Sequence, residues 1–410
     1  AVFHRYHSPQ DRDIASIPPP PRILRGGGWL WCGETHLHHP FRLTRSKLSE
    51  EAHDGLVEVR AHLVAAMAVA TDADVEDERA CREASLQKLR KRPRRAAAVP
   101  TGKRHFSFGI ITDVQYADIP NGKSFHGVPR YYRHSLEVLK RAVKDWSAKD
   151  LQFAVQLGDI VDGNHPSEKA HEGLTSVTRL FEQLRCRTWH TLGNHCLYTS
   201  QREKLHNYLN IPAAEDGASY YEFSPVPGWR IFMLDSYDVS VLGWPEGHPR
   251  RLLAESILNE KNPNVNKNSP DGLEGVQRRF VKFGGGVSDD QLRWLERKLR
   301  QAKEQDERAI LCTHLPLHPK TAHPNSLLWN FEQVNETIAS FAGTAVAVFS
   351  GHCHRDRETF DEHGIYYRVF EAVLECPPGA DAYGHIDVHE NCMVVHGVGR
   401  LNSARVLFRS

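Results

Sequence analysis

The segment FSFGIITDVQ, residues 106–115, indicates how the chain folds. Its apolar run 106–112 has the length of one strand and is followed by two polar residues, Asp113 and Gln115. Short apolar runs bounded by turn-forming residues are typical of strands that are buried on both faces. We therefore predict a central strand that ends in two side chains able to bind a ligand.

The same pattern recurs at four later points of the chain, where an apolar run ends in glycine, aspartate, asparagine or histidine. These runs are 153–157 before Gly158 and Asp159, 188–192 before Gly193, Asn194 and His195, 309–313 before His314, and 345–349 before Gly351 and His352. Open α/β sheets bind ligands at the carboxyl ends of their strands. We therefore expect these polar residues to lie on one edge of a sheet.

Helical patterns separate the predicted strands. One stripe at helical spacing consists of Leu136, Leu139, Val143 and Trp146. Ser288 and Gln291 are typical of a capping box, and they precede a second stripe formed by Leu292, Leu295 and Leu299. The alternation of strands and helices predicts the α/β fold class.

The pattern becomes all β after Glu358. Apolar runs lie at 365–370, 385–389 and 393–398. The simplest interpretation is a second sheet packed on the first.

Residues 1–104 differ in composition from the rest of the chain. They contain a proline run at 18–21, a glycine run at 26–28, an acidic run at 72–78 and a basic run at 88–95. A segment of this kind cannot bury a core, so we expect a disordered extension before a folded domain over 105–410. The basic run is interpreted as a solvated tether, with a nuclear localisation or nucleic-acid patch as the alternative.

Composition limits the possible partners. The 52 basic and 51 acidic residues leave a formal charge of +1, so no overall field attracts nucleic acid or an anionic membrane. The apolar run 63–70 is shorter than the roughly 20 residues of a membrane span, and no basic region precedes it at the start, so no secretory signal is expected. Eight cysteines without a C-x-x-C pair favour free thiols in a reducing compartment. We expect a cytoplasmic monomer without nucleic-acid or membrane partners.

Seven side chains at the ends of the predicted strands have the types and positions of metal ligands. Carboxylate, amide oxygen and imidazole groups bind divalent first-row metals, and residues at i and i+2 after a strand can reach one ion. A carboxylate is the best bridge between two ions, which predicts Asp159 as the shared ligand. The ligands are Asp113, Gln115, Asp159 and His354 for one ion, and Asp159, Asn194, His314 and His352 for the other. The alternative is that these residues only cap turns.

The order Asp-x-Gln, Gly-Asp, Gly-Asn-His, His and Gly-His-x-His resembles the calcineurin-like metallophosphoesterase superfamily over residues of about 105–400. More narrowly, the chain resembles the manganese-dependent ADP-ribose/CDP-alcohol diphosphatases. The segments that carry this resemblance are ITDVQY (111–116), YYRH (131–134), NSP (268–270), FGGGVS (283–288), HLP (314–316) and LWN (328–330). The resemblance implies a four-layer αββα sandwich of two mixed β-sheets flanked by helices. It also implies hydrolysis of the pyrophosphate bond of ADP-ribose or CDP-choline, giving a nucleoside monophosphate and a second phosphate ester.

Two residues depart from the wider superfamily. Gln115 stands where most members have histidine, and Cys196 follows Gly-Asn-His where an acidic residue is usual. Because an amide oxygen is a harder ligand than an imidazole, Gln115 favours two divalent ions of the Mn²⁺ type, with Mg²⁺ as a second choice over zinc or iron. Cys196 is expected to be an inert buried thiol, with a redox-sensitive thiol as the alternative.

His195 is the candidate catalytic residue. It is expected just outside the metal ligands, where it would protonate or stabilise the leaving phosphate oxygen. The two ions would activate a water for in-line attack on phosphorus. With ADP-ribose the products would be AMP and ribose 5-phosphate.

Six residues are candidates for substrate binding: Phe125, Arg130, Tyr132, Arg133, Asn268 and Ser269. The arginines and the tyrosine would clamp a phosphate or ribose, or only cover a helix start, and Phe125 would stack on the nucleobase or form a hydrophobic lid. Asn268 and Ser269 lie in the long segment 244–286, which is expected to be a substrate-selecting lid with glycines 284–286 as its hinge.

Two other functions stay open on the sequence. A phosphomonoesterase or cyclic-nucleotide phosphodiesterase would use the same two ions. A catalytically weak binding scaffold would keep the fold without the chemistry, although seven intact ligand positions argue against it.

Overall fold

The computed structural model describes residues 102–165, 169–214 and 216–408. The predicted extension, with its basic run, therefore lies outside the described residues except at 102–104. The folded part begins with strand β1 at Arg104, one residue before the predicted start of the domain.

The first sheet has six strands in the order β14-β13-β12-β1-β4-β5. Its strands are β1 (Arg104–Ile111), β4 (Phe153–Gln156), β5 (Arg187–His190), β12 (Ala382–His389), β13 (Cys392–Gly399) and β14 (Ala404–Leu407). β1, β4 and β5 are parallel, whereas β12, β13 and β14 continue the sheet antiparallel from β1. The parallel half therefore places three carboxyl ends side by side.

The second sheet also has six strands, in the order β10-β11-β9-β8-β7-β6. Its strands are β6 (Tyr221–Phe223), β7 (Trp229–Met233), β8 (Arg308–Cys312), β9 (Ala345–Ser350), β10 (Arg357–Phe360) and β11 (Tyr366–Val369). The four central strands are parallel, and β6 and β10 form antiparallel edges. A two-stranded ribbon of β2 (Gly122–Lys123) and β3 (Pro129–Arg130) lies outside both sheets.

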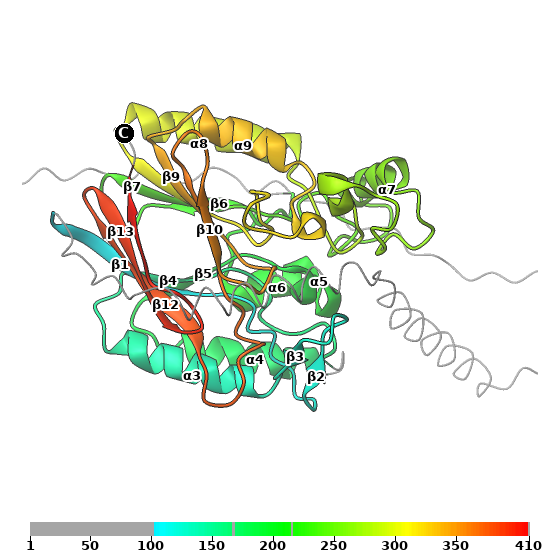
Figure 1. Cartoon of the computed structure of the whole chain (residues 1–410), viewed down its shortest axis with the longest axis horizontal. Helices are drawn as coiled ribbons and strands as arrows, with labels where there is room; N and C mark the ends of the chain where they lie inside the picture. Colours follow the sequence, from blue (N-terminus) through cyan, green and yellow to red (C-terminus); the bar gives the residue numbers. More distant parts are fainter. Residues whose placement is uncertain (1–101, 166–168, 215, 409–410) are drawn as a thin grey trace, which may run out of the picture. The chain divides into compact units, whose positions relative to one another are not determined.

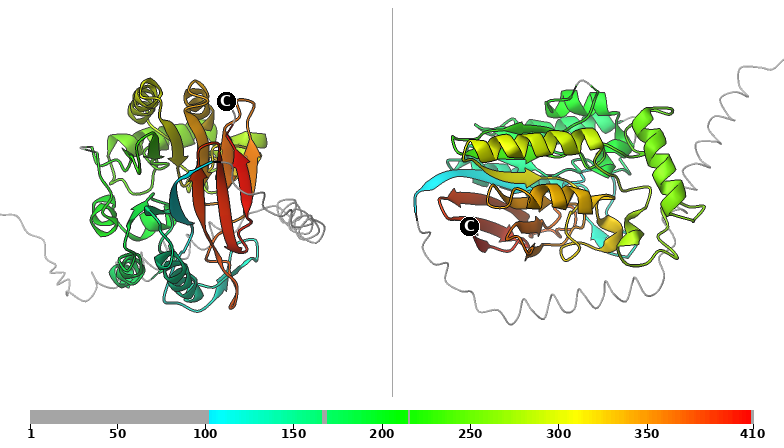
Figure 2. Two further views of the ribbon diagram at one scale, coloured as in Figure 1. Left: turned by 90° about the vertical axis from the view of Figure 1, so that its left-hand side faces the viewer. Right: turned by 90° about the horizontal axis from the view of Figure 1, so that it is seen from above.

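Helices cover the outer face of each sheet (Figures 1 and 2). α3 (His134–Ser147) and α4 (Ala170–Phe181) lie against the first sheet, and α8 (Asp289–Glu304) and α9 (Phe331–Ala339) lie against the second. The remaining helices of the described residues are α5 (Asn194–Thr199), α6 (Arg202–Leu209), α7 (Pro249–Lys261) and the 3₁₀ turns η2 (Gly275–Arg279) and η3 (Pro324–Ser326). This arrangement confirms the predicted four-layer αββα sandwich.

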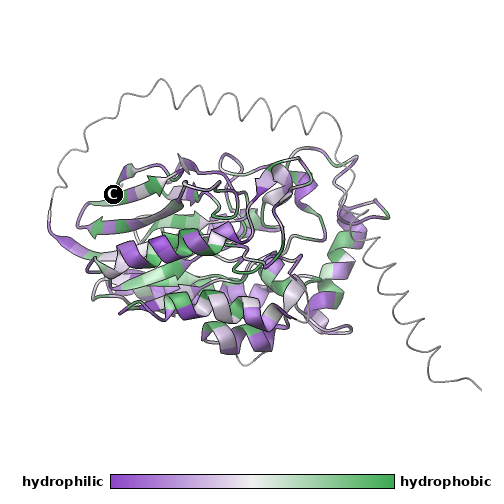
Figure 3. Cartoon of the chain, turned by 90° about the horizontal axis from the view of Figure 1, so that it is seen from below, coloured by the Kyte–Doolittle hydropathy of each residue, from purple (hydrophilic) through white to green (hydrophobic). Residues whose placement is uncertain are grey.

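The core lies between the two sheets. Phe108 of β1 stacks on Phe153 of β4 at 4.8 Å between ring centroids, and it meets Phe349 of the other sheet at 6.4 Å. Phe106 contacts Trp229 across the same gap at 5.5 Å. Each large side chain buried in this way contributes roughly 1.5–3 kcal/mol. Figure 3 shows mostly hydrophobic central strands, and helices on which hydrophilic and hydrophobic residues alternate.

Most of the predicted strands and helices are confirmed, with boundaries that differ by a few residues. The stripe at 136–146 lies on α3, and Ser288 caps α8, where its side chain accepts a hydrogen bond from the backbone of Gln291. Leu295 and Leu299 are buried on that helix, and Leu292 is partly buried.

Two expectations about the arrangement are wrong. The strands after Glu358 do not form a sheet of their own, because β12–β14 join β1 while β10 and β11 join β9. The second expectation concerns the segment 244–286, whose abundance of Asn, Pro, Gly and charge suggests one long loop. It contains α7, which begins with Pro249 after the cap residue His248, and it buries Ala254 and Leu258 in a small cluster with Trp329.

Among the described residues, no helix is both long and apolar enough to cross a membrane.

Candidate metal centre

The seven predicted ligands come from five strand ends that belong to both sheets. Asp113 and Gln115 follow β1, Asp159 follows β4, and Asn194 begins α5 just after β5. The three histidines come from the second sheet, where His314 follows β8, and His352 and His354 follow β9. The expectation of a single sheet edge is therefore wrong, because the centre lies where the carboxyl ends of two facing sheets meet.

The first predicted ligand group is brought together. The amide nitrogen of Gln115 lies 3.1 Å from Asp159 Oδ2 and 3.1 Å from His354 Nε2. His354 Nε2 is in turn 3.3 Å from Asp113 Oδ1. The other oxygen of Asp113 accepts hydrogen bonds from the Thr112 hydroxyl at 2.6 Å and from the backbone of His352 at 3.1 Å. The carboxylate is thus fixed with Oδ1 toward the other ligands.

The second group shares Asp159 with the first. One ligand atom each of Asp159, His314 and His352 lies within 4.8 Å of the others, and His314 Nε2 is 3.4 Å from Asp159 Oδ2. Asp159 Oδ1 accepts the backbone N–H of His195 at 2.8 Å. The buried Asn194 directs its Oδ1 toward the hydroxyl of Tyr237, which donates to it at 3.2 Å.

The backbone is strained at five of the seven ligands. Asp113, Gln115, Asp159, His352 and His354 have φ values between 42° and 67°. Such a left-handed conformation costs a residue other than glycine on the order of 1–3 kcal/mol and persists where the surroundings enforce it. The strain turns side chains from the strand ends toward one point, and its concentration here supports a functional site.

Two glycines of the motifs are required by close packing. A Cβ on Gly351 would lie 2.1 Å from the Thr112 hydroxyl and 2.6 Å from Asp113 Oδ2. A Cβ on Gly193 would lie 2.1 Å from Asp159 Oδ1. The glycines of Gly-His-x-His and Gly-Asn-His thus let the backbone approach the two carboxylates.

Two potential ligand atoms are buried without a hydrogen bond within the described part of the chain. They are Oε1 of Gln115 and Nε2 of His314. An unsatisfied buried polar atom costs on the order of 1–3 kcal/mol, and Nε2 of His314 lies 3.4 Å from Asp159 Oδ2. Three imidazoles, two side-chain amides and two carboxylates form a donor set that fits two divalent cations.

Electrostatics keep the carboxylates ionised. Burial raises the pKa of Asp113, but His354 and then His314 outweigh burial and hold the pKa below its usual value. The pKa of Asp159 is also lowered, because His314 and His195 oppose the effect of burial. Burial and the neighbouring His314 lower the pKa of His352 to about 3, so this imidazole is neutral at physiological pH.

Three supporting contacts have no signal in the sequence. Glu375 holds Nδ1 of His354 at 2.9 Å, and the carbonyl of Leu157 holds Nδ1 of His314 at 2.7 Å. The third is the bond from the Tyr237 hydroxyl to Asn194. Partners of this kind fix the orientation of a ligating side chain. Glu375 comes from the loop after β11 and Tyr237 from the loop after β7, and neither belongs to a strand-end motif.

His195 lies beside the ligands. Its Nδ1 accepts the backbone N–H of Gly163 at 2.9 Å and is 3.2 Å from Asp162 Oδ2. The Nε2 atom has no hydrogen-bond partner among the described residues. Because an N–H points at Nδ1, neutral His195 carries its hydrogen on Nε2. Asp162 is held ionised, since His195 and Arg130 outweigh burial and lower its pKa to about 2.

Cys196 is fully buried and accepts a hydrogen bond from the backbone of Ile160 at 3.3 Å. Burial raises the pKa of its thiol to about 12. These properties favour the inert thiol over the redox-sensitive one.

The candidates for substrate binding differ in their burial and in their contacts. Arg130 lies 3.7 Å from Asp162, and Phe125 is 44% exposed. Tyr132 is buried against Ala117 and Leu374. Arg133 pairs with Asp118 at 2.6 Å, and both side chains are more than half exposed. Arg130 is therefore connected to His195 through Asp162, whereas the ring of Tyr132 packs in the interior.

Asn268 and Ser269 lie in a turn after α7. The Ser269 hydroxyl accepts the backbone N–H of Asp271 at 3.1 Å, and the Asn268 N–H is bound by Asn266 at 3.0 Å. Within the described ranges, no hydrogen bond joins this turn to the metal ligands.

Glycines 284–286 are buried and closely packed. A Cβ on Gly284 would lie 2.6 Å from Trp329 Nε1, and one on Gly285 would lie 2.4 Å from the carbonyl of Ser236. Gly286 also forms an isolated bridge with Val239. These contacts favour a packing role over the hinge that the sequence suggested.

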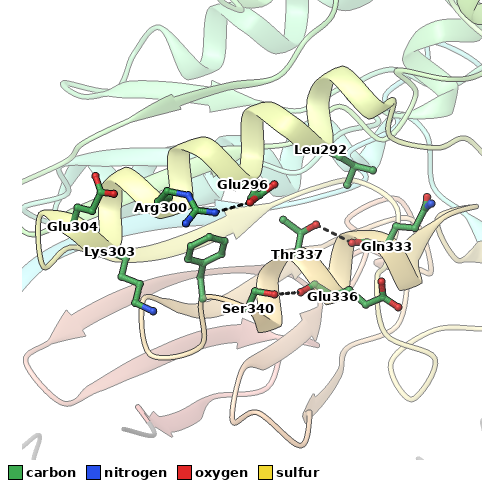
Figure 4. Close-up of a pocket in the computed structure, with 10 residues that line it drawn as sticks. Leu292, Glu296, Arg300, Lys303, Glu304, Gln333, Glu336, Thr337 and Ser340 are labelled. Carbon is green, nitrogen blue, oxygen red and sulfur yellow. Dashed lines mark hydrogen bonds and ion pairs between the residues drawn. The ribbon is translucent and has the colours of Figure 1, made fainter.

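A pocket between α8 and α9 lies apart from the metal centre (Figure 4). None of the seven ligands lines it. Several of its side chains are paired within their own helices, as in the Glu296–Arg300 ion pair at 2.7 Å and the hydrogen bond from Thr337 to the carbonyl of Gln333 at 3.0 Å. The pocket therefore takes no part in holding the predicted ions.

Comparison with known proteins agrees with the geometry. Residues 106–356 match the family described as calcineurin-like phosphoesterase. The chain is 47% identical over 299 residues to a manganese-dependent ADP-ribose/CDP-alcohol diphosphatase of Arabidopsis thaliana, an alignment that covers 73% of this chain and 96% of that protein. The human protein of the same name is 36% identical over 327 residues, with coverage of 76% and 95%.

A solved structure is similar over the same region. The crystal structure of a dimetal phosphatase from Danio rerio superposes with a TM-score of 0.72 at 35% sequence identity, and it covers 75% of this chain and 100% of that chain.

Proposed function

Because the chain belongs to the calcineurin-like phosphoesterase family and, within it, to the manganese-dependent ADP-ribose/CDP-alcohol diphosphatases, we propose that it hydrolyses the pyrophosphate bond of ADP-ribose and of CDP-alcohols such as CDP-choline. One observation carries the proposal: seven ligand side chains converge from two sheets, and the ligand atoms of Gln115 and His314 are buried without hydrogen bonds within the described part of the chain.

The ligand set assigns two divalent ions. Asp113, Gln115, Asp159 and His354 would hold one, and Asp159, Asn194, His314 and His352 would hold the other, with Asp159 shared. The hard amide oxygens favour Mn²⁺, with Mg²⁺ as a substitute. When bound, the ions supply Lewis-acid activation of water and neutralisation of phosphoryl charge.

The chain's own residues orient the substrate and protonate the leaving oxygen. The Gly163 N–H fixes the ring of His195 and leaves Nε2–H available to donate to the leaving oxygen. One P–O bond of the pyrophosphate breaks, water supplies the oxygen of the new P–O bond, and the bridging oxygen leaves with the second phosphate. ADP-ribose then gives AMP and ribose 5-phosphate, and CDP-choline gives CMP and phosphocholine.

Substrate contacts are assigned on position. We propose that Arg130 binds a phosphate and that Phe125 stacks on a base. The ion pair of Arg130 with Asp162 near His195 and the exposure of the Phe125 ring support these roles. Arg133, Tyr132, Asn268 and Ser269 are secondary candidates, because their described contacts are local.

Product analysis tests the function. Full-length protein with added Mn²⁺ is incubated with ADP-ribose, CDP-choline and bis(p-nitrophenyl) phosphate, and the products are resolved by anion-exchange chromatography. We expect a nucleoside monophosphate and a second phosphate ester in equal amounts. Release of inorganic phosphate would instead identify a phosphomonoesterase, and turnover of the diester alone would identify a phosphodiesterase. No turnover with any substrate would leave a binding scaffold.

We also propose that the enzyme acts in the cytoplasm as a monomer. The six cysteines of the described residues are all free thiols, as expected in a reducing compartment. Light scattering of the purified chain at micromolar concentration checks the oligomeric state, and a dimer would contradict the proposal.

A further inference from the structure

A second cluster of metal-ligating side chains lies on the first sheet. His385 and Asp387 of β12 and His396 of β13 each offer one ligand atom, and these atoms lie within 4.8 Å of one another. The strand register creates the cluster, because His385 lies directly opposite His396 and Asp387 follows His385 on the same face. All three side chains are partly exposed, so an ion in solution can reach them.

The cluster is separate from the metal centre. Asp387 pairs with Ser107 of β1, whose neighbours Phe106 and Phe108 face the core, so the cluster occupies the opposite face of the sheet. Ser107 precedes the ligand Asp113 by six residues. At about 3.3 Å per residue of a strand, this separation is roughly 15–20 Å. No ion could be shared between the two sites.

The carboxylate of Asp387 is oriented by groups from β1. Its Oδ1 accepts a hydrogen bond from the Ser107 hydroxyl and lies 3.5 Å from the guanidinium of Arg104. Its Oδ2 is directed to Nε2 of His396 at 2.9 Å. Oδ1 is therefore held by the side chains of β1, and Oδ2 faces an imidazole nitrogen. Metal-binding carboxylates are commonly oriented in this way by hydrogen bonds from residues that do not bind the metal.

The two imidazoles are arranged in parallel. The rings of His385 and His396 stack with centroids 4.4 Å apart and an interplanar angle of 10°. Because an imidazole binds an ion in the plane of its ring, an ion bound by both histidines would turn the rings out of this stack. Nδ1 of His385 is buried and has no hydrogen-bond partner in the described part of the chain. The ion pair between His396 and Asp387 does not explain why Nδ1 of His385 lacks a partner. This nitrogen lies beside a second imidazole and an oriented carboxylate.

We propose that His385, Asp387 and His396 bind one divalent transition-metal ion, and that Zn²⁺ is the ion that fits best. Two imidazoles and one carboxylate are ligands that zinc accepts in its tetrahedral sites, with solvent in the fourth position. The ion would clamp β12 to β13 on the side of the sheet away from the catalytic centre. Binding to the folded state alone would stabilise the protein.

Zinc binding to the Mn²⁺-loaded full-length protein tests the proposal. Wild type is compared with His385→Asn, His396→Gln and the control His363→Gln, which replaces an exposed histidine in the turn before β11. Zinc and manganese per chain are measured by elemental analysis after equilibrium dialysis over a range of Zn²⁺ concentrations. We expect wild type and the control to bind one zinc ion more than either site variant, whose affinity falls at least about tenfold.

Zinc that displaces manganese from the catalytic centre is common to all four proteins and cancels in the comparison. Hydrolysis with Mn²⁺ is expected to be unchanged in the site variants, since the cluster is remote. Equal zinc content and an equal zinc-induced rise in melting temperature in all four proteins would overturn the proposal. If His385→Asn does not fold, His396→Gln, at a side chain that is 44% exposed, decides the question alone.

Discussion

At the scale of single residues, the metal centre contains side chains that lack hydrogen bonds. Oε1 of Gln115 and Nε2 of His314 are buried without hydrogen bonds in the described residues, and the backbones of Gln115 and Asp159 are left-handed. Each feature destabilises the metal-free protein. Bound cations would offset these costs, so metal binding and folding should be coupled.

Variants at Asp159 and at His195 are expected to differ in the number of metal ions bound per chain. Asp159→Asn removes the charge shared between two cations and should lose close to one ion or more, together with turnover. His195→Ala should keep both ions and slow hydrolysis by about 10²- to 10⁴-fold, the usual contribution of a general acid. Elemental analysis and steady-state kinetics on both variants measure the difference. Metal loss from His195→Ala with two ions retained in Asp159→Asn would reverse the assignment of ligand and acid.

Glu375 is expected to act through His354. Replacing it by glutamine in Glu375→Gln removes the negative charge beside Nδ1 and should weaken binding of the first ion by about 10- to 100-fold. Glu362→Gln is the matched control, because that side chain is 82% exposed and remote from the ligands. Mn²⁺ titrations of activity give both affinities. Equal affinities in the two variants would show that Glu375 has no part in positioning the ligand.

At the scale of elements, the strand ends could be predicted and the strand pairing could not. Short apolar runs before Asp113, Asp159 and His314 identify buried strands by a local pattern. Which sheet a strand joins depends on pairing between residues that are far apart in sequence, so the division of β10–β14 between two sheets left no local signal. The ligands could be predicted for the same local reason, whereas Glu375 and Tyr237 reach the site only through the tertiary fold.

Helix α7 was missed although its start signal was present. His248 caps the helix and Pro249 occupies its first turn, an arrangement typical of a helix N-terminus. The abundance of Asn, Pro and charge over 244–286 obscured this signal. Since Ala254 and Leu258 bury the helix against Trp329, much of the predicted lid is a packed element.

The junction of α6 with the end of β7 contains a buried ion pair. Arg202 donates to Asp235 at 2.7 Å, and the two side chains are 4% and 0% exposed. Arg202→Ala leaves a buried unpaired carboxylate and should cost about 3–5 kcal/mol. The exposed pair of Arg293 and Asp290 is the control, and Arg293→Ala should cost less than about 1 kcal/mol. Chemical denaturation measures the free energy of unfolding of both variants. A similar loss of stability in the two would contradict this account of the junction.

At the scale of the whole molecule, function is assigned to the two-sheet domain. β1 begins at Arg104, forms a central strand and is followed directly by two of the ligands. The composition of residues 1–101 favours a segment that contributes little to catalysis.

A deletion variant tests this division. Removal of residues 1–101 is expected to leave turnover and melting temperature close to those of the full chain. Removal of residues 1–108 is the control, and it should abolish folding because five of the eight residues of β1 are lost. A large fall in stability or activity in the shorter deletion would show that the preceding segment supports the domain.

The central claim is a catalytic centre of two metal ions shared through Asp159, and a manganese titration tests it most directly. Metal-stripped full-length protein is titrated with Mn²⁺ while bound metal and hydrolysis of ADP-ribose are followed in the same samples. We expect no hydrolysis without metal and full hydrolysis only as occupancy approaches two ions per chain. Full hydrolysis at one ion per chain, or in the stripped protein, would contradict the claim.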